Sequence, residues 1–131
     1  MVRLSKEEAR ALGLAPAASK YNNDKPTYYD PDLKESLKFD SVKERDYYLL
    51  YKFKLKRGEI SDLRRQVPYE IQPAFTDILG VEHKPIIYLA DFVYKDRDNV
   101  EHIVDVKGFK TDVYKLKKKL LAYRGVIIEE I

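Results

Sequence analysis

The stretch Ile103-Val-Asp-Val-Lys-Gly108 decides the fold prediction, because it has the pattern of a short buried strand that carries two charges. Side chains alternate between the two faces of a strand, so Asp105 and Lys107 are expected on one face and Val104 and Val106 on the other. A glycine then ends the strand, and a lysine-rich helix follows. An acid and a lysine on an apolar strand are costly to bury unless they are paired or used in function.

A second strand is predicted over Pro85–Tyr94, which is rich in β-branched and aromatic residues. The polar cluster Lys95–Asn99 has turn chemistry, so the two strands should form an antiparallel hairpin. With the turn centred near Asp98, facing residue numbers sum to about 196, which sets Asp91 opposite Asp105. Two carboxylates about 5 Å apart repel by roughly 3 kcal/mol at an effective dielectric of 20. Lys107 offsets part of this repulsion, and a hard divalent cation such as magnesium would offset more.

Length and composition indicate one soluble globular domain. The chain has 131 residues, of which 44% are hydrophobic and 36% charged, so it can bury a core but is too short for two domains. It has no cysteine, no apolar run long enough to span a bilayer and no signal-peptide pattern at its start. These features exclude disulfides and thiolate zinc sites, and we expect a cytoplasmic protein in a reducing compartment.

The net charge of +3 is too small to indicate nucleic-acid binding by itself. The distribution of charge is more informative, because Lys107–Arg124 contains seven lysines or arginines and one acid, Asp112. This local charge of +6 adjoins the predicted carboxylate patch.

The start of the chain has little periodicity. Ser5–Glu8 is a possible capping box for a short helix that Gly13 would end. Residues 15 to 38 read as an extended arm with a small hairpin around Tyr28 and Tyr29. Lys20–Asn23 mixes a cation with an aromatic ring, which suits contact with nucleic acid, although a solvated arm explains it equally well.

The first long helix is predicted from an N-cap at Ser41 to a stop at Gly58, with Glu44 completing the capping box. Its apolar stripe is predicted to contain Val42, Tyr48, Leu49, Phe53 and Leu55. Glu44 has two interpretations: a capping carboxylate, which stabilises the helix by about 1 kcal/mol, or a third acid directed at the carboxylate patch.

Strand-like pieces are predicted over 63–67 and 69–72, with Pro68 marking a bulge or an edge, and 73–84 reads as a loop. The last helix begins at Thr111 or Asp112 and ends at Gly125, and its core stripe is predicted to be Val113, Leu116, Leu120 and Leu121. Residues 126–128 are predicted to form a final strand. The chain is therefore predicted to be α/β, in the order helix, three strands, helix, strand, with a mixed sheet flanked by helices.

This order resembles the PD-(D/E)XK nuclease superfamily, whose fold is a restriction-endonuclease-like core. The resemblance is carried by Phe39–Glu44, Gln72–Pro73, Ala90–Phe92 and Asp105–Thr111, which look most like small phage-encoded proteins of that superfamily. It covers residues 38–131, so we expect an N-terminal arm over 1–37 and a nuclease-like domain over 38–131.

The resemblance implies hydrolysis of DNA phosphodiesters with magnesium or manganese. It implies that Asp91 and Asp105 ligate the metal and that Glu44 is a further ligand or a ligand to a second metal. It also implies that Lys107 orients the attacking water and stabilises charge on the phosphate. Many members of the superfamily have glutamate where this chain has Asp105. The expected function is therefore that of a phage or prophage endonuclease that cuts branched DNA. Holliday-junction resolution is the activity to test first.

DNA contacts are expected from the last helix, whose N-terminal N–H groups form an anion site. The residues predicted to bind DNA are Lys110, Thr111, Lys115, Lys118 and, on a neighbouring strand, Gln72. A two-fold symmetric junction predicts a homodimer, and a monomeric nicking or flap nuclease is the alternative. The alternatives are a non-catalytic DNA-binding accessory protein and a structural Asp105–Lys107 salt bridge. Tyr114 is expected to pack, and His83 and His102 are expected at the surface.

Overall fold

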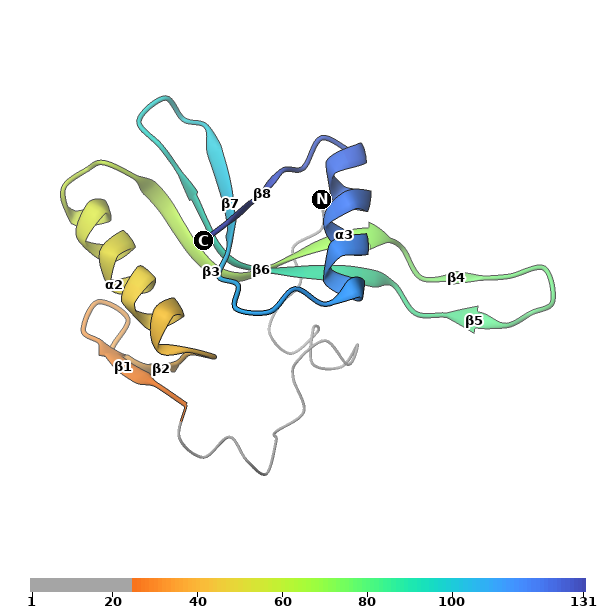
Figure 1. The fold of residues 1–131 in the computed structure, drawn as a ribbon, viewed down its shortest axis with the longest axis horizontal. Coiled ribbons are helices and arrows are strands. Elements are labelled where there is room, and N and C mark those ends of the chain that lie inside the picture. The colour runs from red at the N-terminus through yellow and green to blue at the C-terminus, as the bar shows by residue number, and fades with distance from the viewer. Residues whose placement is uncertain (1–24) are drawn as a thin grey trace.

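The structure, a computed structural model, describes residues 25–131 (Figure 1). The helix predicted at Ser5–Gly13 and the cluster Lys20–Asn23 lie outside the described residues. In chain order the elements are β1 (Thr27–Asp30), β2 (Glu35–Lys38), α2 (Val42–Lys56), β3 (Ser61–Gln72), β4 (Phe75–Thr76), β5 (Glu82–His83), β6 (Ile86–Lys95), β7 (Glu101–Asp105), α3 (Asp112–Tyr123) and β8 (Ile128–Glu130). Neither helix within the described range has the length and apolar character needed to cross a membrane.

A four-stranded mixed sheet in the order β3-β6-β7-β8 forms the centre of the molecule. The β3–β6 and β6–β7 pairs are antiparallel, and β7–β8 is parallel because α3 connects the two strands. The β6–β7 register pairs Phe92 with Val104 and Tyr94 with His102, so facing numbers sum to 196. The predicted hairpin and its register are confirmed, and they direct Asp91 and Asp105 to the same point of the sheet.

Strand β3 corrects the prediction of two pieces interrupted at Pro68. It is one continuous strand in which Pro68 pairs with Leu89, and its register shifts lie elsewhere, between Ser61 and Arg64 and between Glu70 and Gln72. Pro68 is tolerated because β3 is an edge strand of the sheet, which confirms the edge alternative.

Helix α2 has the predicted N-cap, since Ser41 Oγ accepts a hydrogen bond from the Glu44 N–H at 3.1 Å. Its inward face differs in part from the predicted stripe. Glu44, Tyr48 and Tyr51 are buried, whereas Val42, Leu49 and Phe53 are exposed. The helix is oriented by its tyrosines, which pack with the buried rings of Phe39 and Phe92.

Helix α3 begins at its predicted cap, Thr111, but most of its predicted core stripe faces outward. Only Leu121 of that stripe is buried, and Val113, Leu116 and Leu120 are exposed. The helix turns Tyr114 and two lysines toward the sheet: Lys117 Nζ donates to the Ile87 carbonyl at 2.8 Å, and Lys118 Nζ donates to Glu130 at 2.6 Å. These polar contacts hold the apolar stripe away from the core. Strand β8 also starts later than the predicted 126–128 strand.

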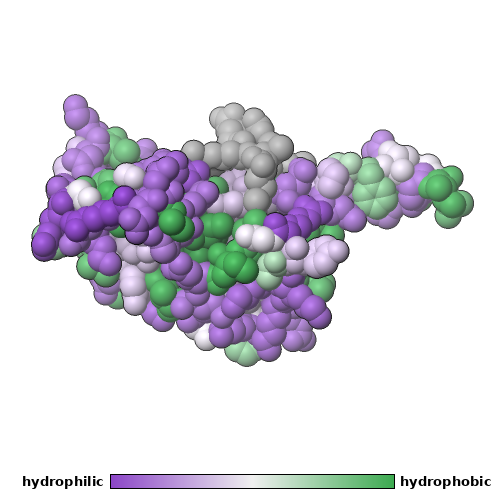
Figure 2. Space-filling model, turned by 90° about the horizontal axis from the view of Figure 1, so that it is seen from above, coloured by the Kyte–Doolittle hydropathy of each residue, from purple (hydrophilic) through white to green (hydrophobic). Residues whose placement is uncertain are grey.

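Two short two-stranded ribbons are separate from the four-stranded sheet. The hairpin predicted around Tyr28 and Tyr29 is confirmed as β1–β2, and its Leu37 is buried against α2. The segment predicted as a loop over 73–84 instead contains the β4–β5 ribbon, which projects from the body of the molecule (Figure 1). Figure 2 shows apolar residues at the end of this ribbon, where Ile78 and Leu79 are exposed.

The two helices cover opposite faces of the sheet. One buried cluster contains Tyr114 and Leu121 of α3, and the other contains Tyr48 and Tyr51 of α2. Along β6 the alternation of faces is interrupted, because Ala90 belongs to the α3 cluster and Phe92, two residues later, belongs to the α2 cluster. On the neighbouring strand, Gln66 has a positive φ of 51° close to the same point. The polar site lies at this irregularity.

Candidate active site

A cavity of about 930 Å³ lies between the β1–β2 hairpin, the start of α2 and the central strands. The four residues predicted to be catalytic, Glu44, Asp91, Asp105 and Lys107, all line it. The remaining lining residues are Lys25, Glu35, Ser36, Leu37, Lys38, Asp40, Ser41, Lys43, Arg65, Gln66, Leu89, Val106 and Gly108. Elements far apart in sequence therefore converge on one polar cavity.

Asp105 and Lys107 lie on the same side of the chain, as predicted. Asp105 is only 2% exposed, and the Lys107 ammonium lies 2.9 Å from its Oδ2. Beyond this ion pair, Oδ2 accepts no hydrogen bond from the described residues. Lys107 Nζ also lies 4.0 Å from the centre of the Tyr114 ring. Val104 and Val106 pack into the α2 cluster on the opposite face, which confirms the predicted alternation.

Asp91 lies at the point where β6 changes face. Its Oδ2 accepts the Val106 N–H at 2.8 Å, which ties the end of β7 to β6. Burial raises the pKa of Asp91 well above its ordinary value, and the adjacent carboxyl groups of Asp105 and Glu44 raise it further. Bringing a cation to this group would stabilise the charged carboxylate and release its proton.

Glu44 makes a capping contact and also lines the cavity. Its Oε2 accepts the Asp40 N–H at 3.1 Å, so it caps the chain entering α2, one residue before the predicted Ser41 N–H. Its Oε1 accepts a hydrogen bond from Gln66 at 3.2 Å inside the cavity. The side chain is 2% exposed, and burial raises its pKa.

Gln66 is a site residue that sequence reasoning missed. Its Nε2 contacts Glu44 Oε1 and lies 3.5 Å from Asp91 Oδ1, so one amide bridges two carboxylates. The β3–β6 register, which pairs Val67 with Ala90 and Arg65 with Phe92, would have placed Gln66 opposite Asp91. That register is not readable from the sequence, because β3 and β6 are separated by the projecting ribbon.

Arg65 also lines the cavity and was not predicted to do so. Its guanidinium carbon lies 4.2 Å from the centre of the Phe39 ring, and Nη2 donates to the Lys38 carbonyl at 2.9 Å. Burial lowers the pKa of Arg65, while the carboxylate of Glu44 favours its charged form. The side chain thus joins the hairpin wall to β3 and places a positive charge beside the acids.

The residues predicted to bind DNA lie outside the cavity lining. Lys110 and Lys118 both contact Glu130 of β8, at 3.3 Å and 2.6 Å. Hydrogen bonding from Lys118 lowers the pKa of Glu130 to about 2. Thr111 Oγ1 accepts the Tyr114 N–H as the helix cap. Lys115 is exposed on α3, and Gln72 is exposed at the end of β3.

The donor chemistry of the cavity fits a hard cation. Three buried or half-buried carboxyl groups, Glu44, Asp91 and Asp105, face it, and Asp105 Oδ2 accepts no hydrogen bond within the described part of the chain. As they stand, no three or more His, Cys, Asp or Glu side chains among residues 25–131 form a group arranged to hold a metal ion. Lys107 and Gln66 occupy positions beside the acids instead.

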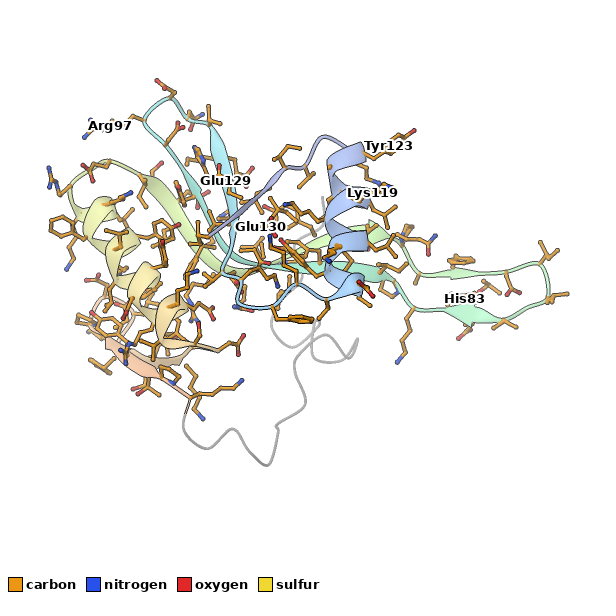
Figure 3. All side chains as sticks on the ribbon, in the orientation of Figure 1. His83, Arg97, Lys119, Tyr123, Glu129 and Glu130 are labelled. Carbon is orange, nitrogen blue, oxygen red and sulfur yellow. The ribbon has the colours of Figure 1, made fainter. Side chains whose placement is uncertain are left out.

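The two histidines have local roles away from this cavity. His102 lies between Asp96 Oδ2, at 2.8 Å, and Glu129 Oε1, at 2.6 Å, and is stacked on Tyr94. His83 contacts Asp77 at 2.8 Å on the β4–β5 ribbon, where Figure 3 labels it. Tyr114 packs in the core, and its hydroxyl donates to Glu130.

Comparison with known proteins gives one family. No curated protein and no solved structure shows a significant match to the chain. The matching family covers residues 18–129 and so extends before Lys38, where the predicted domain begins. The chain belongs to the family described as "Protein of unknown function (DUF1064)".

Proposed function

We propose that this protein is a divalent-metal-dependent deoxyribonuclease that hydrolyses phosphodiesters in branched DNA. The observation that carries the proposal is the convergence of Glu44, Asp91, Asp105 and Lys107 on one cavity. The acids come from α2, β6 and β7, and the lysine follows two residues after Asp105. This arrangement supports a restriction-endonuclease-like core, in which a mixed sheet presents the acids between two helices.

The charges of the cavity suit a metal and a phosphate together. Its lining includes five cationic residues (Lys25, Lys38, Lys43, Arg65, Lys107) and five acidic residues (Glu35, Asp40, Glu44, Asp91, Asp105). The formal charges therefore cancel without a metal ion. Binding one divalent cation would make the cavity net positive, which favours the anionic backbone of a nucleic acid.

Asp91 and Asp105 are the carboxylates that would hold magnesium or manganese, with Glu44 as a further ligand. A bound divalent cation lowers the pKa of a coordinated water and neutralises charge on phosphoryl oxygens. Val106, whose N–H binds Asp91 Oδ2, keeps that carboxylate directed into the cavity. Gln66 holds Glu44 and Asp91 at a fixed spacing from the other side.

Lys107 is the residue placed to act on the substrate. Its ammonium lies beside Asp105 and over the Tyr114 ring, so it is held at the cavity wall while part of the side chain stays accessible. An ammonium is a compact point charge that can bind a phosphate oxygen and orient a water molecule. In this protein it would stabilise negative charge that develops on the phosphate.

Cleavage of a labelled four-way DNA junction with magnesium or manganese tests the proposal. The wild type should cut it, and Asp105→Asn and Lys107→Ala should each lower the rate by about 100-fold or more. Lys115→Ala is the matched control, because it removes an exposed lysine outside the cavity and should retain activity. No cutting of junction, duplex or single-stranded DNA by the wild type with either metal would refute the proposal.

A non-catalytic DNA-binding accessory protein is the second candidate. It is favoured by the Lys107–Asp105 ion pair and by the lack of a ready three-ligand metal group within residues 25–131. The two candidates make different predictions for metal binding. A nuclease should show a magnesium-dependent rise in melting temperature that Asp105→Asn abolishes, whereas the accessory protein should show no such rise.

A further inference from the structure

We propose that the nucleic-acid backbone enters the cavity across the β1–β2 hairpin and the start of α2, where Lys38 and Lys43 bind its phosphates. This inference rests on the proposed function and identifies which face of the protein holds the substrate. It differs from the sequence-based expectation, which assigned the backbone contacts to the lysines of α3.

The hairpin side offers cations that are free to bind an anion. Lys38 and Lys43 are both exposed, both line the cavity, and neither forms an ion pair with another described residue. Lys38 sits at the end of β2, and Lys43 sits in the first turn of α2. The Lys38 backbone is held by Arg65, whose Nη2 binds its carbonyl, so this part of the wall is tied to β3. The two ammonium groups are therefore carried by ordered backbone beside the acids.

The α3 side offers fewer free cations near the site. Lys110 and Lys118 share the carboxylate of Glu130, and Lys117 donates to the Ile87 carbonyl. Lys115 and Lys119 are exposed, but neither lines the cavity. In Figure 3, Lys119 projects from α3 away from β8. The high positive charge of this segment is thus used largely within the fold.

The lining also indicates what part of the nucleic acid is recognised. No aromatic side chain lines the cavity within the described range, so it lacks the stacking surfaces that hold unpaired bases. The amide of Gln66, which could read a base edge, is already bound to Glu44. Lysine contacts to phosphates position a strand without reading its sequence. We therefore expect backbone recognition with little dependence on base sequence.

Fluorescence anisotropy of a labelled DNA junction in EDTA measures binding without cleavage. The variant Lys38→Ala/Lys43→Ala is compared with Lys115→Ala/Lys119→Ala, which removes the same charge from exposed positions outside the cavity. The hairpin variant should lose about 10-fold or more in affinity, and its slope of log K against log salt should fall by about 2. The α3 variant should lose less than about 2-fold. Lys38→Arg/Lys43→Arg should bind nearly as the wild type does, and unchanged melting temperatures would confirm folding.

Equal losses in the two alanine variants, or a larger loss on α3, would overturn the inference. These results are separate from the fate of the proposed function. If the wild type cleaves DNA and the hairpin variant binds it normally, the proposed path of the DNA backbone is wrong, but the proposed nuclease activity is supported. If the wild type cleaves no DNA and only the hairpin variant loses DNA binding, the proposed path of the backbone is supported and the proposed nuclease activity is refuted.

Discussion

Gln66 donates a hydrogen bond to Glu44 across the cavity, with 3.2 Å between Nε2 and Oε1. The same amide lies 3.5 Å from Asp91 Oδ1. A neutral donor thus separates two carboxylates that would otherwise repel, and it does so from a backbone position with a φ of 51°, which is uncommon for a residue other than glycine. Strained backbone of this kind persists where the surrounding structure holds it, often at functional sites.

The variant Gln66→Glu should be destabilised by about 1–3 kcal/mol at pH 8, because it replaces the donor with a further carboxylate among three acids. At pH 5 the penalty should be smaller, since Asp91, whose pKa burial and the neighbouring carboxyl groups raise to about 8, is then largely protonated. Urea unfolding at the two pH values measures this difference. Gln72→Glu, at the exposed end of β3, should change stability by less than about 0.5 kcal/mol at both. An equal effect of the two variants would contradict the bridging role.

Asp91→Asn should stabilise the metal-free protein at neutral pH. The folded pKa of Asp91 is raised, so its contribution to stability is fully present below its unfolded pKa, about 3.9, and is lost as the pH rises through the folded value. Asparagine stays neutral, and its carbonyl can still accept the Val106 N–H. We expect a gain of about 1–3 kcal/mol at pH 8 and almost none at pH 4, measured by urea unfolding. Magnesium should no longer stabilise this variant, and a pH-independent effect would refute the argument.

His102 should stabilise the fold most in its protonated form. Hydrogen bonds to Asp96 and Glu129 raise its pKa, so the stabilisation is fully present below the unfolded value, about 6.5, and is lost as the pH rises through the folded one. His102→Gln should therefore be less stable than the wild type at pH 6, and the difference should shrink toward pH 9. Thermal melts across this range, compared at one salt concentration, measure it. A difference in melting temperature between the wild type and His102→Gln that grows with pH would exclude the ion-pair explanation.

Leu121 and Leu116 lie on the same helix and are chemically identical, but only Leu121 is buried. Leu121 is 0% exposed in the core, whereas Leu116 is 57% exposed. Leu121→Ala should cost about 2–5 kcal/mol because it leaves a cavity, and Leu116→Ala should cost less than about 0.5 kcal/mol. Urea unfolding of the two variants tests which face of α3 packs. Similar losses in both would show that the outward stripe is covered in solution.

The sequence predicted the β6–β7 hairpin well because its information is local. A short turn between two β-rich segments sets the register, and the register alone brings Asp91 to Asp105. The caps at Ser41 and Thr111 were predictable for the same reason, since each depends on residues within one turn of a helix. Local chemistry thus accounts for the placement of Asp91, Asp105 and Lys107 in the candidate site.

The helix faces were less predictable because packing decides them. On α3, hydrophobicity favoured burial of Val113 and Leu116, yet Tyr114 and the sheet contacts of Lys117 and Lys118 set the rotation. Long side chains can bury apolar stems while their charged ends find partners, which a simple stripe does not represent. Gln66 was missed because its position depends on the long-range pairing of β3 with β6.

Asp30 provides a test of whether the hairpin wall matters for DNA binding. It is fully buried at the end of β1, accepts hydrogen bonds from Tyr48 Oη and from the Asp32 and Leu33 N–H groups, and pairs with Lys52 at 3.3 Å. Burial alone would raise the pKa of Asp30, but these partners lower it below its ordinary value. Asp30→Ala should therefore cost about 3–5 kcal/mol, because it leaves buried groups unpaired.

The effect of Asp30→Ala on DNA affinity separates two explanations. The substitution removes a negative charge, so general electrostatic attraction predicts tighter binding. If the hairpin forms the wall that carries Lys38, loosening it should weaken binding instead, although Asp30 does not line the cavity. Asp32→Ala is the control: Asp32 pairs with the same Lys52 at 2.6 Å, but it is half exposed and should affect stability by about 1 kcal/mol at most. Fluorescence anisotropy decides between the two explanations, at a temperature where circular dichroism shows that both variants are folded. Tighter DNA binding by Asp30→Ala would show that the hairpin wall has no part in holding DNA.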